Sequence, residues 1–188
     1  MPQKRPLVAV YCSSCGDLPG EVTLGAQQIA AAIGQCGADL VYGGVNAGLM
    51  HTVAQAAHDA GAQIHGVIPS VFSHRADPLC HHIHPTPDLA TRKQRMIAMA
   101  DIFIVLPGGI GTLDEWISTL SDIMVREKTD PDADRPILVW NHADMYSGMA
   151  AQLAATAAGP YARGRRVDRS HIHPTPAALI AHLKSLLP

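Results

Sequence analysis

Short apolar runs alternate with longer segments of helical periodicity along most of the 188-residue chain. Continuous apolar runs of this length are typical of parallel strands buried on both faces. Strands are therefore predicted at Leu7–Tyr11, Leu40–Tyr42, Gln63–Ile68, Ile102–Leu106 and Ile137–Trp140. Helices are predicted at Glu21–Cys36, Leu49–Ala60, Thr91–Ala100, Tyr146–Ala157 and Ala177–Leu187, and in a segment that ends near Arg126.

Three segments depart from this alternation. The segment from Ser70 to Pro87 is rich in His and Pro and is expected to be irregular, the charged segment from Glu127 to Arg135 is expected to be a loop, and a short strand is expected between the last two helices. Alternating strands and helices imply a parallel sheet with helices on both sides. Because no repeat, linker or low-complexity tail interrupts the pattern, residues 1–188 are expected to form a single doubly wound, Rossmann-like α/β domain with a mainly parallel sheet.

Composition and charge narrow the expected partners. The formal net charge is −2, whereas a dedicated nucleic-acid-binding domain is usually basic. No apolar run approaches the roughly 20 residues that cross a bilayer, and the run from Leu7 to Tyr11 is too short for a signal peptide. Four cysteines are too few for a disulfide scaffold in a chain of this length. We therefore expect a cytoplasmic protein without a nucleic-acid or membrane partner.

Two glycine-rich turns follow predicted strands directly and precede predicted helices. They are Gly43–Gly48 and Gly108–Thr112. In a doubly wound sheet such turns lie at the carboxyl edge, where helix N-termini direct amides at anionic ligands. Neither turn is a dinucleotide fingerprint, since Asp114 stands where the third glycine of the second turn belongs, and no P-loop lysine follows. The turns indicate a phosphate site; two merely tight turns are the alternative.

Glu115 admits two interpretations. Thr112-x-x-Glu115 is the pattern of a capping box, in which the Glu side chain reaches back to the N-cap amide. On the pattern alone, this structural interpretation is favoured. The functional interpretation places a carboxylate one turn inside a phosphate-binding helix, close to the sugar that carries the phosphate. The two interpretations are compatible, because a substrate can displace a cap.

The nine residues from Pro107 to Glu115, PGGIGTLDE, resemble the PGGxGTxxE signature of the lonely-guy (LOG) family. Three further segments are similar to motifs of the same family and occur in the same order: Val8–Ser14, Tyr42–Met50, and Arg92-Lys93 followed by Met96. The chain departs from the pattern at Ser13 and Val45, where the family has glycine, and at Ala90-Thr91, where it commonly has His-Glu. These departures concern base recognition more than the catalytic residues.

The resemblance implies hydrolysis of the N-glycosidic bond of a cytokinin or purine nucleoside 5'-monophosphate to free base and ribose 5-phosphate. It implies that Arg92 and Glu115 are catalytic, that the protein is a homodimer, and that no metal or organic cofactor takes part. The scheme needs a fixed carboxylate near the cationic sugar, and an Arg that orients rather than donates a proton. The nucleotide- and phosphate-binding residues implied are Gly43, Gly44, Lys93, Met96, Gly108, Gly109, Ile110, Gly111 and Thr112.

Several alternatives remain open at this level. The same turns suit a non-catalytic nucleotide sensor, and without the resemblance Arg92 and Lys93 are an ordinary solvated helix face. Cys12-x-x-Cys15 is a weak candidate for a redox pair. Two groups of metal-ligand residue types have no standard metal-ligand spacing: the histidines and Cys80 between His74 and His84, and His171-x-His173. The histidines are interpreted as exposed loop residues. Lysine decarboxylation, a label many LOG-like proteins carried, is rejected because no pyridoxal-phosphate lysine environment is evident.

Overall fold

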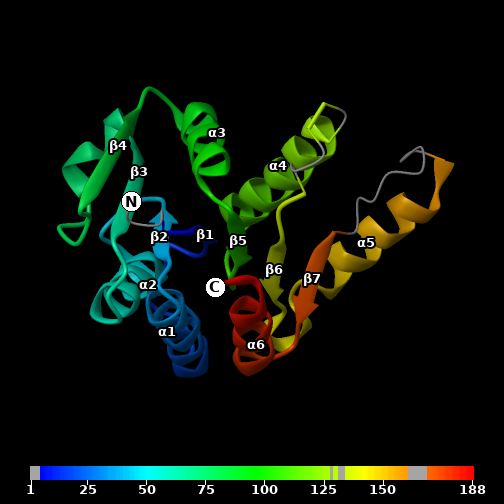
Figure 1. Cartoon of the computed structure of the whole chain (residues 1–188), viewed down its shortest axis with the longest axis horizontal. Helices are drawn as coiled ribbons and strands as arrows, with labels where there is room; N and C mark the ends of the chain where they lie inside the picture. The colour runs from blue at the N-terminus through cyan, green and yellow to red at the C-terminus, as the bar shows by residue number, and fades with distance from the viewer. Residues whose placement is uncertain (1–4, 128, 131–133, 161–168) are drawn as a thin grey trace.

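The computed structural model describes residues 5–127, 129–130, 134–160 and 169–188, and these residues contain a seven-stranded parallel sheet (Figure 1). The strand order is β4-β3-β2-β1-β5-β6-β7. The strands are β1 Leu7–Tyr11, β2 Asp39–Tyr42, β3 Ile64–Pro69, β4 His82–Thr86, β5 Ile102–Val105, β6 Ile137–Trp140 and β7 Ser170–His173. Every neighbouring pair is parallel, so the predicted α/β fold class is confirmed.

Six α-helices in the described part of the chain connect the strands: α1 Gly20–Gln35, α2 Gly48–Asp59, α3 Leu89–Met99, α4 Ile110–Arg126, α5 Ser147–Ala158 and α6 Pro176–Leu186. Short 3-10 helices follow β3 (η1, Ser70–Arg75) and β6 (η3, His142–Asp144). Helix α3 begins two residues before the predicted start because Asp88 caps it, accepting a bond from the Thr91 amide at 2.7 Å. Part of the loop predicted at Glu127–Arg135, residues 128 and 131–133, lies outside the described residues.

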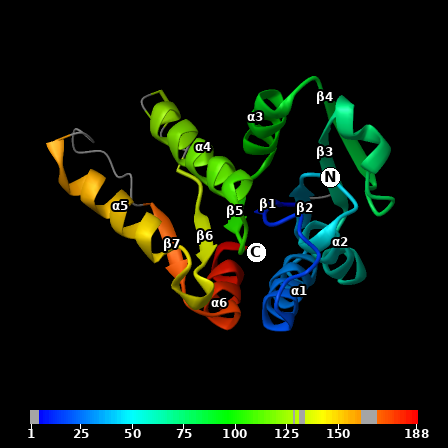
Figure 2. The ribbon, with the colours of Figure 1, turned by 180° about the vertical axis from the view of Figure 1, so that it is seen from behind.

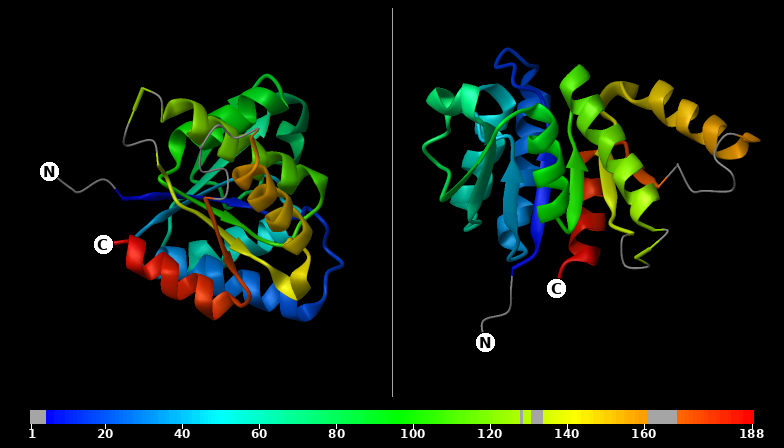
Figure 3. Two further views of the ribbon diagram at one scale, coloured as in Figure 1. Left: turned by 90° about the vertical axis from the view of Figure 1, so that its right-hand side faces the viewer. Right: turned by 90° about the horizontal axis from the view of Figure 1, so that it is seen from above.

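The helices form two layers, one on each face of the sheet (Figure 3). Helices α1, α2 and α6 cover one face, with α1 and α2 side by side (Figure 2), and α3, α4 and α5 cover the other. Strand β1 shows why both layers hold, since Val8 and Val10 belong to one buried cluster while Ala9 and Tyr11 belong to the other. None of the helices in the described residues combines the length and apolarity required to cross a bilayer.

The strand order reverses at β1, which lies between β2 and β5. The chain moves outward from β1 through β2, β3 and β4, then returns to the other side of β1 with β5. In a doubly wound sheet, the loops that leave the two strands at such a point diverge to opposite faces and leave a crevice at the carboxyl edge. The segments after Tyr11 and Val105 therefore border the expected ligand site.

The prediction that Ser70–Pro87 is irregular is wrong over part of its length. Residues 70–75 form η1, and His82–Thr86 form β4 in register with β3, His65 opposite His82. Strand β4 is an edge strand, largely exposed, so it carries none of the apolar pattern that identified the buried strands. Pro85 is tolerated there because an edge strand has one row of backbone groups without a ladder partner.

Histidines gather on β3 and β4 at this edge of the sheet. His65 Nδ1 lies 3.2 Å from His84 Nε2, and the His65 ring stacks on His82 at a centroid distance of 4.5 Å. Burial, followed by the charges of His82 and His84, lowers the pKa of His65 to about 4, and burial also lowers the pKa of His84. His65 and His84 are therefore held neutral in the folded protein at neutral pH.

This histidine cluster should make the fold sensitive to acid. Below the unfolded-state pKa of about 6.5, the unfolded chain takes up a proton at His65 that the folded chain binds only near pH 4, so the free energy of unfolding should fall across that window. Thermal melts between pH 7 and pH 5 should show a falling Tm, and His65→Gln should make that fall shallower. An unchanged pH dependence in this variant would remove His65 as a cause.

Candidate active site

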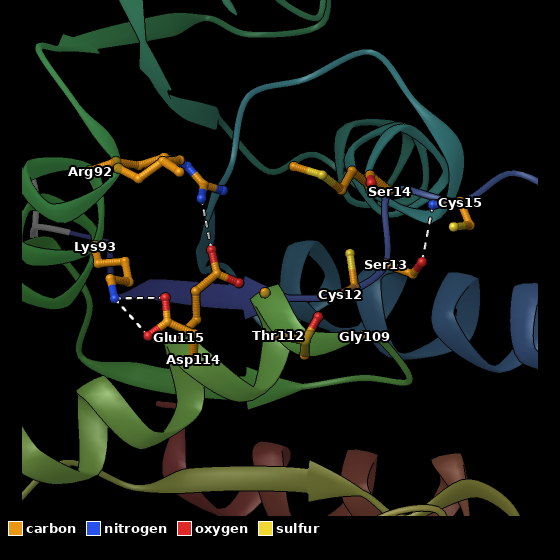
Figure 4. Close-up of a pocket in the computed structure, with 13 residues that line it drawn as sticks. Cys12, Ser13, Ser14, Cys15, Arg92, Lys93, Gly109, Thr112, Asp114 and Glu115 are labelled. Atoms are coloured by element: carbon orange, nitrogen blue, oxygen red, sulfur yellow. Dashed lines mark hydrogen bonds and ion pairs between the residues drawn. The ribbon is translucent and has the colours of Figure 1, made fainter.

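A cleft of about 310 Å³ lies at the carboxyl ends of β1 and β5, where the strand order reverses (Figure 4). One wall is the loop that leaves β1, and the opposite wall is the beginning of α4. Helix α3 closes a third side. The lining residues are Cys12, Ser13, Ser14, Cys15, Met50, Leu89, Arg92, Lys93, Gly109, Gly111, Thr112, Asp114 and Glu115. The crevice expected from the topology is therefore present, and residues from all four segments that carry the LOG resemblance line it.

The second glycine turn forms the N-terminus of α4. Gly109 is the N-cap residue, and intrahelical bonding begins with the Leu113 amide, which donates to the Gly109 carbonyl at 3.1 Å. The preceding amides of the first turn have no intrahelical acceptor by helix geometry. A Cβ built on Gly109 or Gly111 meets nothing within 4 Å, so the backbone there is open to a ligand. This is the arrangement that binds an anion at a helix N-terminus.

Gly108 serves a different purpose from Gly109 and Gly111. A Cβ on Gly108 would lie 2.1 Å from Thr112 Oγ1 and 3.0 Å from the Ser13 amide nitrogen. The missing side chain lets Thr112 pack against the turn, with 3% of its surface exposed, and keeps the loop after β1 close to it. Ile110, by contrast, is 84% exposed and does not line the cleft.

The capping-box interpretation of Thr112 and Glu115 is wrong. Helix α4 starts at Ile110, so Thr112 lies inside its first turn, and no side chain caps the helix. The Glu115 side chain points away from the N-cap, and its Oε1 lies 3.0 Å from Arg92 Nη1 (Figure 4). The N-cap is Gly109, which has no side chain and contributes only its backbone carbonyl to the first intrahelical bond.

Glu115 and Arg92 form a largely buried ion pair that joins α4 to α3. Their side chains are 9% and 15% exposed. Burial raises the pKa of Glu115, and the charge and hydrogen bond of Arg92 oppose that rise. The Glu115 carboxylate faces the cleft in a low-dielectric surrounding, where its electrostatic interactions are stronger than in water. The interpretation of Arg92 and Lys93 as an ordinary solvated helix face is therefore wrong for Arg92.

Three contacts orient the Arg92 guanidinium. Nη1 pairs with Glu115, Nε donates to the Val67 carbonyl at 3.1 Å, and Nη2 lies over the Cα of Gly43, where a Cβ would be only 2.0 Å away. Gly43 thus makes room for the arginine, and does not line the cleft with Arg92 and Glu115. The adjacent Gly44 has φ of +73°, a conformation that L side chains rarely adopt.

The remaining predicted residues divide between the cleft wall and the core. Lys93 lines the cleft and is anchored by Asp114, 2.7 Å from its Nζ, and by Ser118 at 3.2 Å. Met96 is fully buried in the core under α3 and packs with residues such as Phe103. The spacing Arg92–Met96 therefore combines a cleft residue with a core residue one turn later.

Sequence reasoning missed two polar residues beneath Glu115. Thr119 Oγ1 donates to the Glu115 carbonyl at 2.8 Å and lies 2.9 Å from the Tyr11 hydroxyl. Both residues are almost completely buried, and burial raises the pKa of Tyr11. The signal was the spacing Thr112, Glu115, Thr119, which places three polar side chains on one face of a helix.

The cysteines of the loop after β1 are free thiols. Burial, followed by the charge of Glu115, raises the pKa of the Cys12 thiol, so it is neither a strong nucleophile nor a reactive redox group at neutral pH. Within the described ranges, no three His, Cys, Asp or Glu side chains are grouped to hold a metal ion.

Comparison with known proteins gives consistent matches. The family model described as "Possible lysine decarboxylase" matches residues 50–183. The cytokinin riboside 5'-monophosphate phosphoribohydrolase of Rhodococcoides fascians is 38% identical over 126 residues, 63% of each chain. That of Mycobacterium tuberculosis is 37% identical over 142 residues, 73% of each chain. The rice enzyme LOG is 35% identical over 117 residues, 61% of this chain and 48% of its own. This chain thus spans less than two thirds of two of these three relatives.

Solved structures share the fold at lower identity. The molybdenum cofactor binding protein of Rippkaea orientalis has a TM-score of 0.75 at 21% identity, covering 98% of both chains. The molybdenum cofactor carrier protein of Chlamydomonas reinhardtii also has a TM-score of 0.75, at 19% identity over 97% of this chain and 98% of its own. At these identities the likeness concerns the fold. The family-model match and the Mycobacterium tuberculosis relative show that the chain belongs to the "Possible lysine decarboxylase", or LOG, family.

Proposed function

We propose that this protein hydrolyses the N-glycosidic bond of a purine or cytokinin nucleoside 5'-monophosphate. The observation that carries the proposal is the buried Arg92–Glu115 pair, which faces the open N-terminus of α4 across one cleft. The relatives named as phosphoribohydrolases support the same reaction. In this reaction the C1'–N bond breaks, the base leaves with the bonding electrons and takes up a proton, and a water oxygen bonds to C1'. The products are free base and ribose 5-phosphate.

The phosphate end of the substrate suits the start of α4. The amides from Gly109 to Thr112 and the Thr112 hydroxyl supply hydrogen-bond donors without a bulky side chain in the way. The positive end of the helix dipole adds to the attraction of an anion. Anchoring the phosphate there fixes the sugar relative to Glu115, which is an orientation effect that lowers the entropic part of the barrier.

The carboxylate of Glu115 suits the reacting end. Positive charge grows on the sugar ring as the C1'–N bond breaks, and a fixed carboxylate stabilises that charge. The same carboxylate can orient the attacking water and accept its proton. Arg92 keeps its own proton, so its role in this scheme is to hold Glu115 ionised and to donate hydrogen bonds toward the departing base. No step requires a metal ion or an organic cofactor.

We also propose that the protein acts as a homodimer through the outer faces of α3 and α4. Among the apolar residues of α4, Leu120 and Ile123 are buried in the core, whereas Ile117 is 36% exposed. Val125, two turns further, is 58% exposed. Both line a surface groove of about 560 Å³ between α3 and α4. Apolar side chains gathered in one groove are typical of a contact surface.

Replacing the carboxylate should abolish most of the activity. Glu115→Gln keeps the shape of the side chain but loses its charge and basicity, so kcat for release of base from AMP or N6-isopentenyl-AMP should fall about 100-fold or more. Glu21→Gln, an exposed carboxylate on α1, is the control and should leave kcat unchanged. Base release is measured by chromatography. Stable binding of both nucleotides with no base release by the unmodified protein would instead identify a sensor.

The acid limb of the kcat/KM profile should lie at a higher pH than a glutamate of ordinary pKa would give. Because burial raises the pKa of Glu115 and the ionised form is required, kcat/KM should fall with decreasing pH at a value above about 4.3. Arg92→Gln removes the charge that opposes the rise and should move the limb to still higher pH. A limb at or below the ordinary glutamate value contradicts this assignment.

The oligomeric state can be tested on the groove between α3 and α4. Light scattering with size-exclusion chromatography should give a dimer at micromolar concentration, and Ile117→Glu should shift it to monomer, because a buried unpaired carboxylate is costly. Leu24→Glu is the matched control, since Leu24 is 56% exposed on α1, on the opposite face of the sheet. An unmodified protein that runs as a monomer, or two variants that dissociate equally, would overturn the proposed surface.

A further inference from the structure

A buried carboxylate lies outside the cleft, between α2 and the loop that follows η1. Asp77 is 1% exposed, and its Oδ2 lies 2.8 Å from Nδ1 of His51, a residue in the first turn of α2. Its Oδ1 accepts a bond from the Leu79 amide at 3.1 Å. A buried carboxylate retains its charge only when its oxygens are satisfied in this way. The reaction scheme uses neither Asp77 nor His51.

Asp77 and its neighbours hold the first glycine turn. The Asp77 amide donates to the Gly44 carbonyl at 2.8 Å, and the Asn46 amide donates to the Arg75 carbonyl at 2.9 Å. Val45 and Ala76 form an isolated antiparallel bridge between these two bonds. Val45 stands where the family pattern has a third glycine, and here it belongs to a short paired segment. The Gly44 carbonyl and the Asn46 amide of the turn are thus committed to contacts with the Asp77 loop.

The same turn carries Gly43, on which the Arg92 guanidinium rests. A Cβ at Gly43 would lie 2.0 Å from Arg92 Nη2, so the position of this backbone decides where the guanidinium can lie. The opposite end of the turn is fixed by Gly48, which packs against the Cys15 carbonyl with φ of +49°. A shift of the turn toward the cleft would push Arg92 out of its pairing distance with Glu115.

We propose that His51 and Asp77 are positioning residues that hold the first glycine turn under Arg92 and so align Arg92 with Glu115. This inference rests on the proposed function of Arg92. The contacts run from His51 to Asp77, from Asp77 to Gly44, and from Gly43 to Arg92. Neither His51 nor Asp77 lines the cleft, so neither touches the substrate in the proposed reaction.

The first test compares two histidines on one helix. His51→Ala leaves the buried Asp77 oxygen without its partner, and kcat should fall about 10-fold or more while KM changes less than about twofold, because the phosphate is held at α4. His51→Gln retains a side-chain donor and should recover much of the loss. His58→Ala is the matched control, since His58 also lies on α2 and pairs with an aspartate, the exposed Asp59. Equal losses in both alanine variants overturn the proposal.

A double variant distinguishes positioning from a general structural role. If His51 acts through Arg92, then His51→Ala should cost no further activity in an Arg92→Gln background. The same factor lost in both backgrounds would overturn the proposal. An Arg92→Gln variant with unchanged kcat would instead refute the proposed function of Arg92, so the two failures are distinguishable.

The pH profile supplies an independent readout. The charged and titratable groups around Glu115 are Arg92 and Lys93 on α3, Asp114 on α4, Tyr11 on β1, and Cys12 after β1. Displacing Arg92 removes the principal group that keeps Glu115 ionised, so the acid limb of kcat/KM should move to higher pH in His51→Ala and stay unchanged in His58→Ala. A limb that does not move in His51→Ala contradicts the proposal.

Two further variants keep the test decisive if His51→Ala does not fold. Asp77→Asn preserves the shape of the buried side chain and should lower kcat in the same direction, without additivity with Arg92→Gln. Gly43→Ala places a methyl group against Arg92 Nη2 and the Met50 Cε, and should lower kcat without changing either His51 or Asp77. Unchanged kcat in both folded variants would overturn the proposal.

Discussion

The ion pair between Arg92 and Glu115 is the interaction on which the cleft depends. Removing a guanidinium or a carboxylate from water costs several kcal/mol, so neither group would be stable at its observed burial without the other. The pair joins α3 to α4 across the place where the strand order reverses. The charges that hold α3 against α4 are also the charges proposed to act on the substrate. The packing of these helices and the proposed chemistry therefore depend on the same ion pair.

The glycines around this pair act through the space they leave. Gly43 admits the guanidinium, Gly108 admits Thr112, and Gly109 and Gly111 leave the start of α4 open. Glycine turns of similar appearance in the sequence thus have unlike tasks. One supports a side chain and is held by the Asp77 loop, while the other presents amides to the cleft. A Cβ at Gly43 or Gly108 would collide with Arg92 or Thr112, whereas a Cβ at Gly109 or Gly111 would meet nothing within 4 Å.

Local pattern was sufficient for most of the fold and for part of the site. The buried strands and amphipathic helices were recognisable because burial on both faces or on one stripe dictates apolar periodicity. Strand β4 escaped because an exposed edge strand carries His and Pro rather than an apolar run. The motif singled out Glu115, but the capping pattern predicted the wrong partner for its carboxylate, the N-cap amide of the same helix. Capping patterns describe contacts within one helix, whereas Arg92 comes from another helix.

The sequence by itself determined the α/β class, the two glycine turns at strand ends, and the presence of Arg92 and Glu115 in motifs that resemble one family. These depend on periodicity and short-range spacing, which are written along the chain. Only the tertiary structure decided that Arg92 meets Glu115, that Met96 is core, and that Asp77 contacts both His51 and the first glycine turn. The reason is physical: side chains 23 or 26 residues apart are brought together by strand order and helix packing, which no local pattern encodes.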